Sequence, residues 1–180
     1  MTIRKLRTID MIIFSVIAAG LDVVLGLYGF FGLRSYLAIS VPIIILLYVR
    51  WGKYALLPNM GIAIIHLFIY DADFLVRLAN AISVLTLSVA LFGLSLKPLK
   101  PTRIAFKYVV LLFIACYLLM VFAEWILLFA FDKQVSIFSH LLNNLINFLL
   151  GFGLLSLIAS QKELLVRMDP YLREKSKESH

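Results

Sequence analysis

Long apolar segments are the feature that most limits what this chain of 180 residues can fold into. A helix needs roughly 20 residues to span about 30 Å of hydrocarbon, and about 17–25 residues is the common range. Six segments approach that length, at residues 11–31, 37–49, 54–70, 74–96, 104–131 and 135–160. No polar linker divides them, so we expect a single membrane domain over residues 1–180. The segment 37–49 is short and carries Pro42, which predicts a kink, a tilt or an extension into the preceding loop.

The composition supports the same interpretation. Hydrophobic residues make up 63% of the chain and charged residues 15%, whereas soluble domains average about 45–50% and about 25%. We therefore predict an all-α integral membrane bundle of six transmembrane helices in a lipid bilayer. The net charge of +7 does not indicate nucleic acid, because the basic residues form no stripe interleaved with exposed aromatic residues. Cys116 is the one cysteine, which excludes a disulfide framework within the chain.

Lysine and arginine are distributed unevenly over the two sides of the predicted bundle. Fourteen of the 17 lie on the side of the termini, and three lie on the other side: Arg34, Arg77 and Lys133. This asymmetry predicts cytoplasmic termini in a multi-pass protein of the cell membrane. The first apolar segment is too long for a signal-peptide core, so we interpret it as a transmembrane helix. In the cytoplasmic tail, 161–180, we expect the sixth helix to continue along the membrane surface until Pro170 ends it.

The stretch from His140 to Gly153 carries polar residues inside an otherwise apolar run. At about 100° per residue, four of them fall within roughly one third of the helix circumference: His140, Asn143, Asn144 and Asn147. Gly151 continues the same face one turn further along. One side of this helix is therefore predicted to be polar in its outer half and closely packed below.

Other polar and aromatic residues are predicted at the same depth, in the outer half of the membrane. They are Glu124, Trp125, His66, Tyr70, Arg77 and Asn80. Ionisable groups at membrane depth are costly and mark functional sites by default. Aromatic rings, amides and a few charges that converge in this way predict an outward-facing cavity for a small-molecule substrate. The alternative is structural: the asparagines would join neighbouring helices, each contributing about 0.6 kcal/mol, and Glu124 would pair with Arg77.

The first helix carries small residues at intervals of three and four. The stripe includes Ser15, Ala18, Ala19 and Asp22, and continues to Gly26. Small residues allow another helix to approach closely, so the stripe predicts a partner-helix contact. The spacing leaves open whether the partner belongs to this chain or to another protein. Asp22 must be paired, protonated or exposed to water.

This combination of features resembles the substrate-binding S component of energy-coupling factor (ECF) transporters of the bacterial plasma membrane. The resemblance covers most of the chain and rests on six helices, cytoplasmic termini, a first helix with small residues and an outer polar cavity. It implies that Ser15 and Ala19 contact a transmembrane T component, which works with ATPase subunits. It also implies binding of a vitamin or related micronutrient near the outer loops and later helices, at Arg34, Tyr36, Glu124, Trp125 and the asparagines. No GxxxxGK[ST] motif provides a nucleotide site in this chain.

Two other functions fit the same residues. A small proton-coupled transporter would use the titration of Asp22, His66, Glu124 and His140. A membrane scaffold or cell-envelope subunit would need no small ligand. We expect no enzyme, because HExxH and GxSxG motifs are absent from the sequence. We therefore assign no catalytic residue, no cofactor and no metal ligand.

Overall fold

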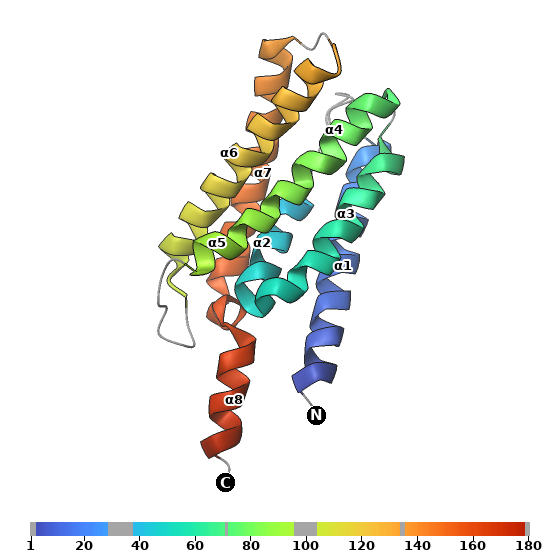
Figure 1. Ribbon diagram of the computed structural model, residues 1–180. Helices are drawn as coiled ribbons and strands as arrows, with labels where there is room; N and C mark the ends of the chain where they lie inside the picture. Colours follow the sequence, from blue (N-terminus) through green and yellow to red (C-terminus); the bar gives the residue numbers. More distant parts are fainter. Residues whose placement is uncertain (1–2, 29–37, 71, 96–103, 134–135, 179–180) are drawn as a thin grey trace.

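The computed structural model describes residues 3–28, 38–70, 72–95, 104–133 and 136–178, and every regular element in these ranges is a helix (Figure 1). The first half contains α1 (Ile3–Tyr28), α2 (Ser40–Trp51), the short 3-10 helix η1 (Gly52–Ala55) and α3 (Leu56–Ile69). Then come α4 (Phe74–Leu85), η2 (Thr86–Val89), α5 (Ala90–Ser95), α6 (Phe106–Ala130), α7 (Ile137–Ser160), η3 (Lys162–Leu165) and α8 (Met168–Glu178).

Within the described ranges, five helical stretches are long and apolar enough to cross a membrane. They are Ile3–Leu27, Ser40–Ile69, Phe74–Ser95, Phe106–Ala130 and Ile137–Ile158. They indicate a multi-pass protein of the lipid bilayer. Both termini lie at one end of the bundle, and the α3–α4 and α6–α7 connections lie at the opposite end (Figure 1). We call this opposite end the distal end.

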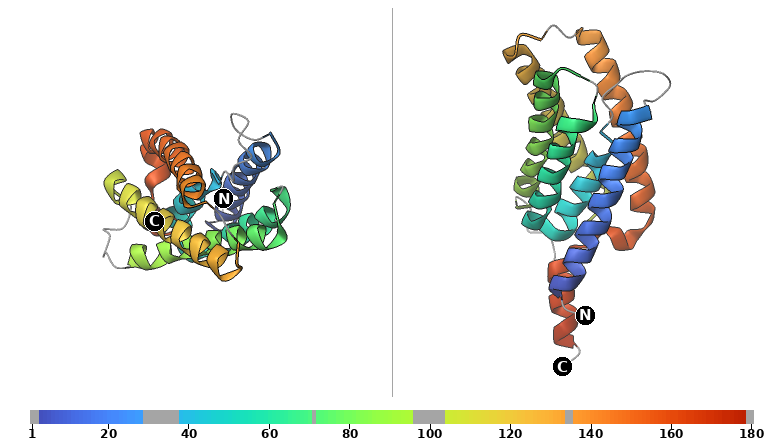
Figure 2. Two further views of the ribbon diagram at one scale, coloured as in Figure 1. Left: turned by 90° about the horizontal axis from the view of Figure 1, so that it is seen from above. Right: turned by 90° about the vertical axis from the view of Figure 1, so that its right-hand side faces the viewer.

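Helix α2 forms the centre of the bundle. All 12 of its residues are buried, and seen from above it is surrounded by the other helices (Figure 2, left). Twelve residues extend only about 18 Å, and this helix can be short because its neighbours shield it from lipid. Pro42 lies in its first turn, where backbone N–H groups have no partner within the helix. The predicted kink is therefore not needed, because the missing N–H costs no helical hydrogen bond.

The chain reverses direction between α2 and α3. At the start of α2, Ser40 contacts Asp22, and at its end Trp51 contacts Asp10, so α2 runs antiparallel to α1. On α3, Asn59 donates to the Tyr48 hydroxyl, and His66 lies beside Asp22, so α3 runs back toward the distal end. Gly52 makes the turn with a φ of 56°, in the left-handed region that favours glycine.

The helix boundaries differ from the predicted segments at three places. Helix α1 begins at Ile3, about two turns before the predicted 11–31 segment, because the basic first turns are helical although they are not apolar. The segment predicted at 74–96 is α4, η2 and α5 in succession. The prediction that Pro170 ends a helix is wrong: α7 ends at Ser160, and Pro170 occupies the first turn of α8, where proline is tolerated.

At the distal end, one ion pair joins the two connections. Lys133 Nζ lies 2.9 Å from Asp73 Oδ2, and the Leu75 N–H donates to Asp73 Oδ1, which caps α4. The Lys133 ammonium, followed by the Leu75 N–H, holds the pKa of the Asp73 carboxyl below its usual range. The stability from these contacts is therefore present near neutral pH and is lost as the pH falls through that lowered pKa. As the pH is decreased in a series of denaturation experiments, the free energy of unfolding should fall less for Asp73→Asn than for the unmodified protein.

Gly151 marks close packing between α7 and the centre of the bundle. A Cβ built at this position would lie 3.2 Å from Phe113 Cζ and 3.6 Å from Pro42 Cδ. Phe113 is fully buried, so it has little freedom to move away. We expect Gly151→Leu to lower the free energy of unfolding by about 1–3 kcal/mol through overpacking. Gly153→Leu is the matched control, since a Cβ there meets no atom within 4 Å. Equal stability of the two variants in mixed-micelle denaturation would contradict the close contact.

Candidate functional site

The structure divides the predicted polar residues into two clusters. The first cluster joins α1, α2 and α3. His66 Nε2 lies 2.7 Å from Asp22 Oδ2, and both side chains are fully buried. The ring of Tyr70 packs edge-on against His66, with centroids 5.4 Å apart. Of the three states that the sequence allowed for Asp22, the structure therefore shows the paired one.

Asp22 also caps the central helix. The Ser40 N–H donates to Asp22 Oδ1 at 2.9 Å, and the Ala38 N–H donates to Asn147 Oδ1 at 3.0 Å. The first turn of a helix has N–H groups without helical partners, and here that turn is buried. Asp22 satisfies one of these donors, and Asn147 accepts from the backbone just before the helix. The Asp22 carboxylate is favourably placed at the positive end of the α2 dipole. Capping by side chains so distant in sequence has no local signal.

The small-residue stripe of α1 divides between two environments. Ala18 and Asp22 are fully buried within the chain, and a Cβ at Gly26 would lie 3.3 Å from Tyr70. These positions contact helices of this chain. Ser15 and Ala19 are half-buried and line a surface groove between α1 and α3.

The second cluster lies between α6 and α7, and we call it the α6–α7 cluster. Glu124 Oε1 lies 3.9 Å from His140 Nδ1. One turn along α7, the amide nitrogen of Asn144 lies 3.3 Å from His140 Nε2 and donates to the His140 carbonyl oxygen. Tyr117 donates its hydroxyl to the Asn144 carbonyl oxygen at 2.8 Å. A carboxyl, an imidazole, an amide and a phenol thus meet in one buried place. Tyr117 was not among the predicted site residues, although it lies two turns before Glu124 on the same helix face.

One carboxylate oxygen in this cluster receives no hydrogen bond from a described residue. Glu124 is 4% exposed, and its Oε2 atom is buried without such a partner. Asn80 Oδ1 on α4 is likewise buried without a hydrogen bond from a described residue. Buried acceptors are nearly always satisfied, since leaving one unsatisfied costs about 1–3 kcal/mol. The Glu124 oxygen can therefore accept a donor from a bound molecule.

Several predicted site residues lie away from these clusters. Trp125 is 46% exposed and packs against Phe122 on the outer surface of α6. Arg77 donates from Nη1 to the Leu67 carbonyl oxygen, and Glu124 pairs with His140. The alternative pairing of Glu124 with Arg77 is therefore not formed in the described part of the chain. Asn143 is half-buried on α7. Arg34 and Tyr36 lie outside the described residues.

The two clusters are near the same end of the bundle. Asp22 and Glu124 each lie six residues before the end of their helices, and His66 lies three residues before the end of α3. His140 lies three residues after the start of α7. All four helix ends are distal ends (Figure 1), so the polar groups occur within two helical turns of that end.

Within the described ranges, no group of three His, Cys, Asp or Glu side chains is arranged to hold a metal ion. Compared with protein-family models, with curated proteins and with solved structures, the chain has no match.

Proposed function

We propose that this chain is the substrate-binding subunit of an ECF-type importer and that it binds a vitamin or related small micronutrient at the α6–α7 cluster. The observation that carries the proposal is the buried Glu124 Oε2 atom, which has no donor among the described residues. His140, Asn144 and Tyr117 surround the same carboxyl with groups that can orient a polar ligand. Phe148 packs against Tyr117 with ring centroids 5.5 Å apart, which adds an aromatic surface for stacking.

The proposed membrane arrangement has six spans, formed by α1, α2, α3, α4 with α5, α6, and α7. The reversal at Gly52 supports two passes within the Ser40–Ile69 stretch. The excess of lysine and arginine on the side of the termini supports cytoplasmic termini in a plasma membrane. The distal end then faces outward, where substrate enters.

The importer also requires a T component and ATPase subunits, which this chain would contact through α1. Ser15 and Ala19 remain accessible on that helix, whereas Ala18 and Asp22 are fully buried. We therefore narrow the proposed partner contact to the side of α1 that carries Ser15 and Ala19.

The decisive experiment is mass spectrometry of small molecules released from the protein after purification in mild detergent. We expect one polar micronutrient in near-stoichiometric amount, and a thermal shift when the same compound is added back. Asn144→Ala should lose the bound compound, whereas Leu149→Ala on the exposed face of α7 should retain it. Protein that carries no compound and responds to none in a vitamin panel would contradict the proposal.

A second candidate is a proton-coupled transporter, favoured by the two buried carboxylate–imidazole pairs at 2.7 Å and 3.9 Å. Such pairs can hold and release protons during a transport cycle. Uptake by proteoliposomes that contain only this chain, driven by a proton gradient, would support this candidate and exclude the importer subunit. Tight binding without such uptake would exclude the candidate.

A further inference from the structure

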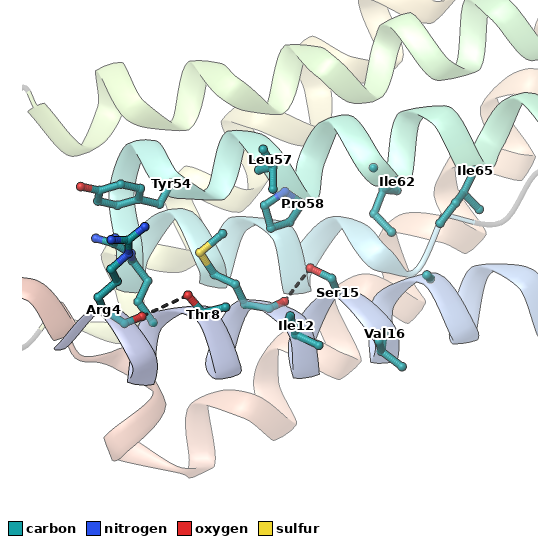
Figure 3. Close-up of a pocket in the computed structure, with 14 residues that line it drawn as sticks. Arg4, Thr8, Ile12, Ser15, Val16, Tyr54, Leu57, Pro58, Ile62 and Ile65 are labelled. Carbon is teal, nitrogen blue, oxygen red and sulfur yellow. Dashed lines mark hydrogen bonds between the residues drawn. The ribbon is translucent and has the colours of Figure 1, made fainter. Parts of the chain in front are cut away.

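A groove runs along the surface between α1 and α3 (Figure 3). Its volume is about 740 Å³, within the range of about 300–1,000 Å³ of small-molecule sites. Along α1 it extends from Arg4 to Ala19, and the facing wall extends from Tyr54 to Ile65. The groove is separate from both polar clusters, whose residues do not line it.

The walls of the groove are apolar even where the sequence places hydroxyl groups. Thr8 donates its hydroxyl to the Arg4 carbonyl oxygen, and Ser15 donates to the Met11 carbonyl oxygen at 2.6 Å (Figure 3). Both donors are therefore used within α1. The remaining surface is aliphatic, with Val16 and Ile12 on one side and Ile62 and Ile65 on the other. Such a surface is suited to a hydrocarbon chain.

The end of the groove nearest the N-terminus is basic. Arg4 is exposed and Arg7 is half-buried, and they lie one helical turn apart on α1. The Arg7 guanidinium lies 3.5 Å from the centroid of the Tyr54 ring, which holds it at the mouth of the groove. No described carboxylate pairs with either arginine, since the nearby Asp10 accepts from Arg50 and Trp51 instead. Two guanidinium groups are thus available to an anion.

We propose that this groove binds an anionic glycerophospholipid, with its phosphate at Arg4 and Arg7 and an acyl chain along the groove. The length of the groove fits an acyl chain: Ala19 lies 12 positions after Arg7, a rise of about 18 Å along α1, and one leaflet of hydrocarbon is about 15 Å thick. The charges are also complementary, because anionic lipid headgroups attract arginines beside a membrane helix. Ser15 and Ala19 also belong to the proposed partner contact, so lipid and T component would exclude each other here.

Filling the groove tests the position of the acyl chain. A Cβ at Gly61, on the α3 wall, meets no atom within 4 Å. Gly61→Leu therefore places a side chain in the groove without a clash, and it removes a glycine from a helix interior. Gly20→Leu is the matched control: its Cβ also meets open space, and Gly20 does not line the groove. Native mass spectrometry should show phospholipid bound to the unmodified protein and to Gly20→Leu, and lost from Gly61→Leu.

The headgroup is tested with delipidated protein. Phosphatidylglycerol should raise the thermal stability more than phosphatidylcholine, and glycerol phosphate without acyl chains should have no effect. Arg4→Gln and Arg7→Gln should each weaken phosphatidylglycerol binding about five-fold and leave the ligand affinity of the α6–α7 cluster unchanged. Equal binding of the two phospholipids, an equal effect of glycerol phosphate, or lipid retained by Gly61→Leu would overturn the proposal. So would a change of oligomeric state in Gly61→Leu without loss of lipid, which would assign the groove to a second copy of the chain.

Discussion

Asp22→Ala should lower the free energy of unfolding by about 3–5 kcal/mol, which is typical for removal of one partner of a buried ionic pair. Asp22 and His66 are both fully buried and 2.7 Å apart. The substitution leaves the imidazole without this carboxyl group and removes the acceptor of the Ser40 N–H at the buried start of α2. The effect should appear as earlier unfolding in a denaturant titration in mixed micelles.

A double-mutant cycle separates the energy of the Asp22–His66 contact from that of the Asp22 hydrogen bond to the Ser40 N–H. We expect the effects of Asp22→Ala and His66→Ala to be strongly non-additive, because each removes the same contact. Asp22→Asn should be less damaging than Asp22→Ala, since the amide oxygen can still accept from Ser40. Additive effects in the cycle would show that the contact contributes little to stability. Unchanged stability of Asp22→Ala would also exclude the capping role.

Glu124→Gln should weaken ligand binding about 10- to 150-fold. The substitution preserves the size of the side chain but replaces the charged acceptor. Hydrogen bonds to charged groups contribute about 1.5–3 kcal/mol, and each 1.4 kcal/mol is about ten-fold in affinity. Isothermal titration with the compound identified by mass spectrometry measures the change. For a scaffold without a ligand, Glu124→Gln would instead change only stability, since it replaces a buried carboxyl group with an amide.

Trp125→Ala distinguishes the proposed site at the α6–α7 cluster from the wider site predicted from sequence. Trp125 follows Glu124 directly but is 46% exposed on the outer surface of α6. We therefore expect unchanged affinity in Trp125→Ala, together with the large loss in Glu124→Gln. A comparable loss in both variants would mean that the substrate contacts the exposed face of α6 rather than the α6–α7 cluster.

The sequence alone determined the membrane class, the helical character and the approximate helix limits of this protein. These properties follow from the length and periodicity of apolar runs, which act within one helix and can be read locally. Gly151 was also predicted to mark close packing, and its short distance to Phe113 confirms this. The polar face of α7 was identified by the same periodicity.

Only the tertiary structure decided which polar residues meet. Asp22 and His66 are 44 residues apart in sequence, and Asn147 accepts from Ala38, 109 residues earlier and just before α2. Their pairing depends on how three helices rotate and pack around α2, and no repeat within one helix carries that information. The predicted single cavity therefore became two clusters: one whose carboxylate caps the central helix, and one whose Glu124 oxygen accepts from no described residue. Adjacent residues on a helix point about 100° apart, but only the packing of α6 decided that Glu124 is buried and Trp125 exposed.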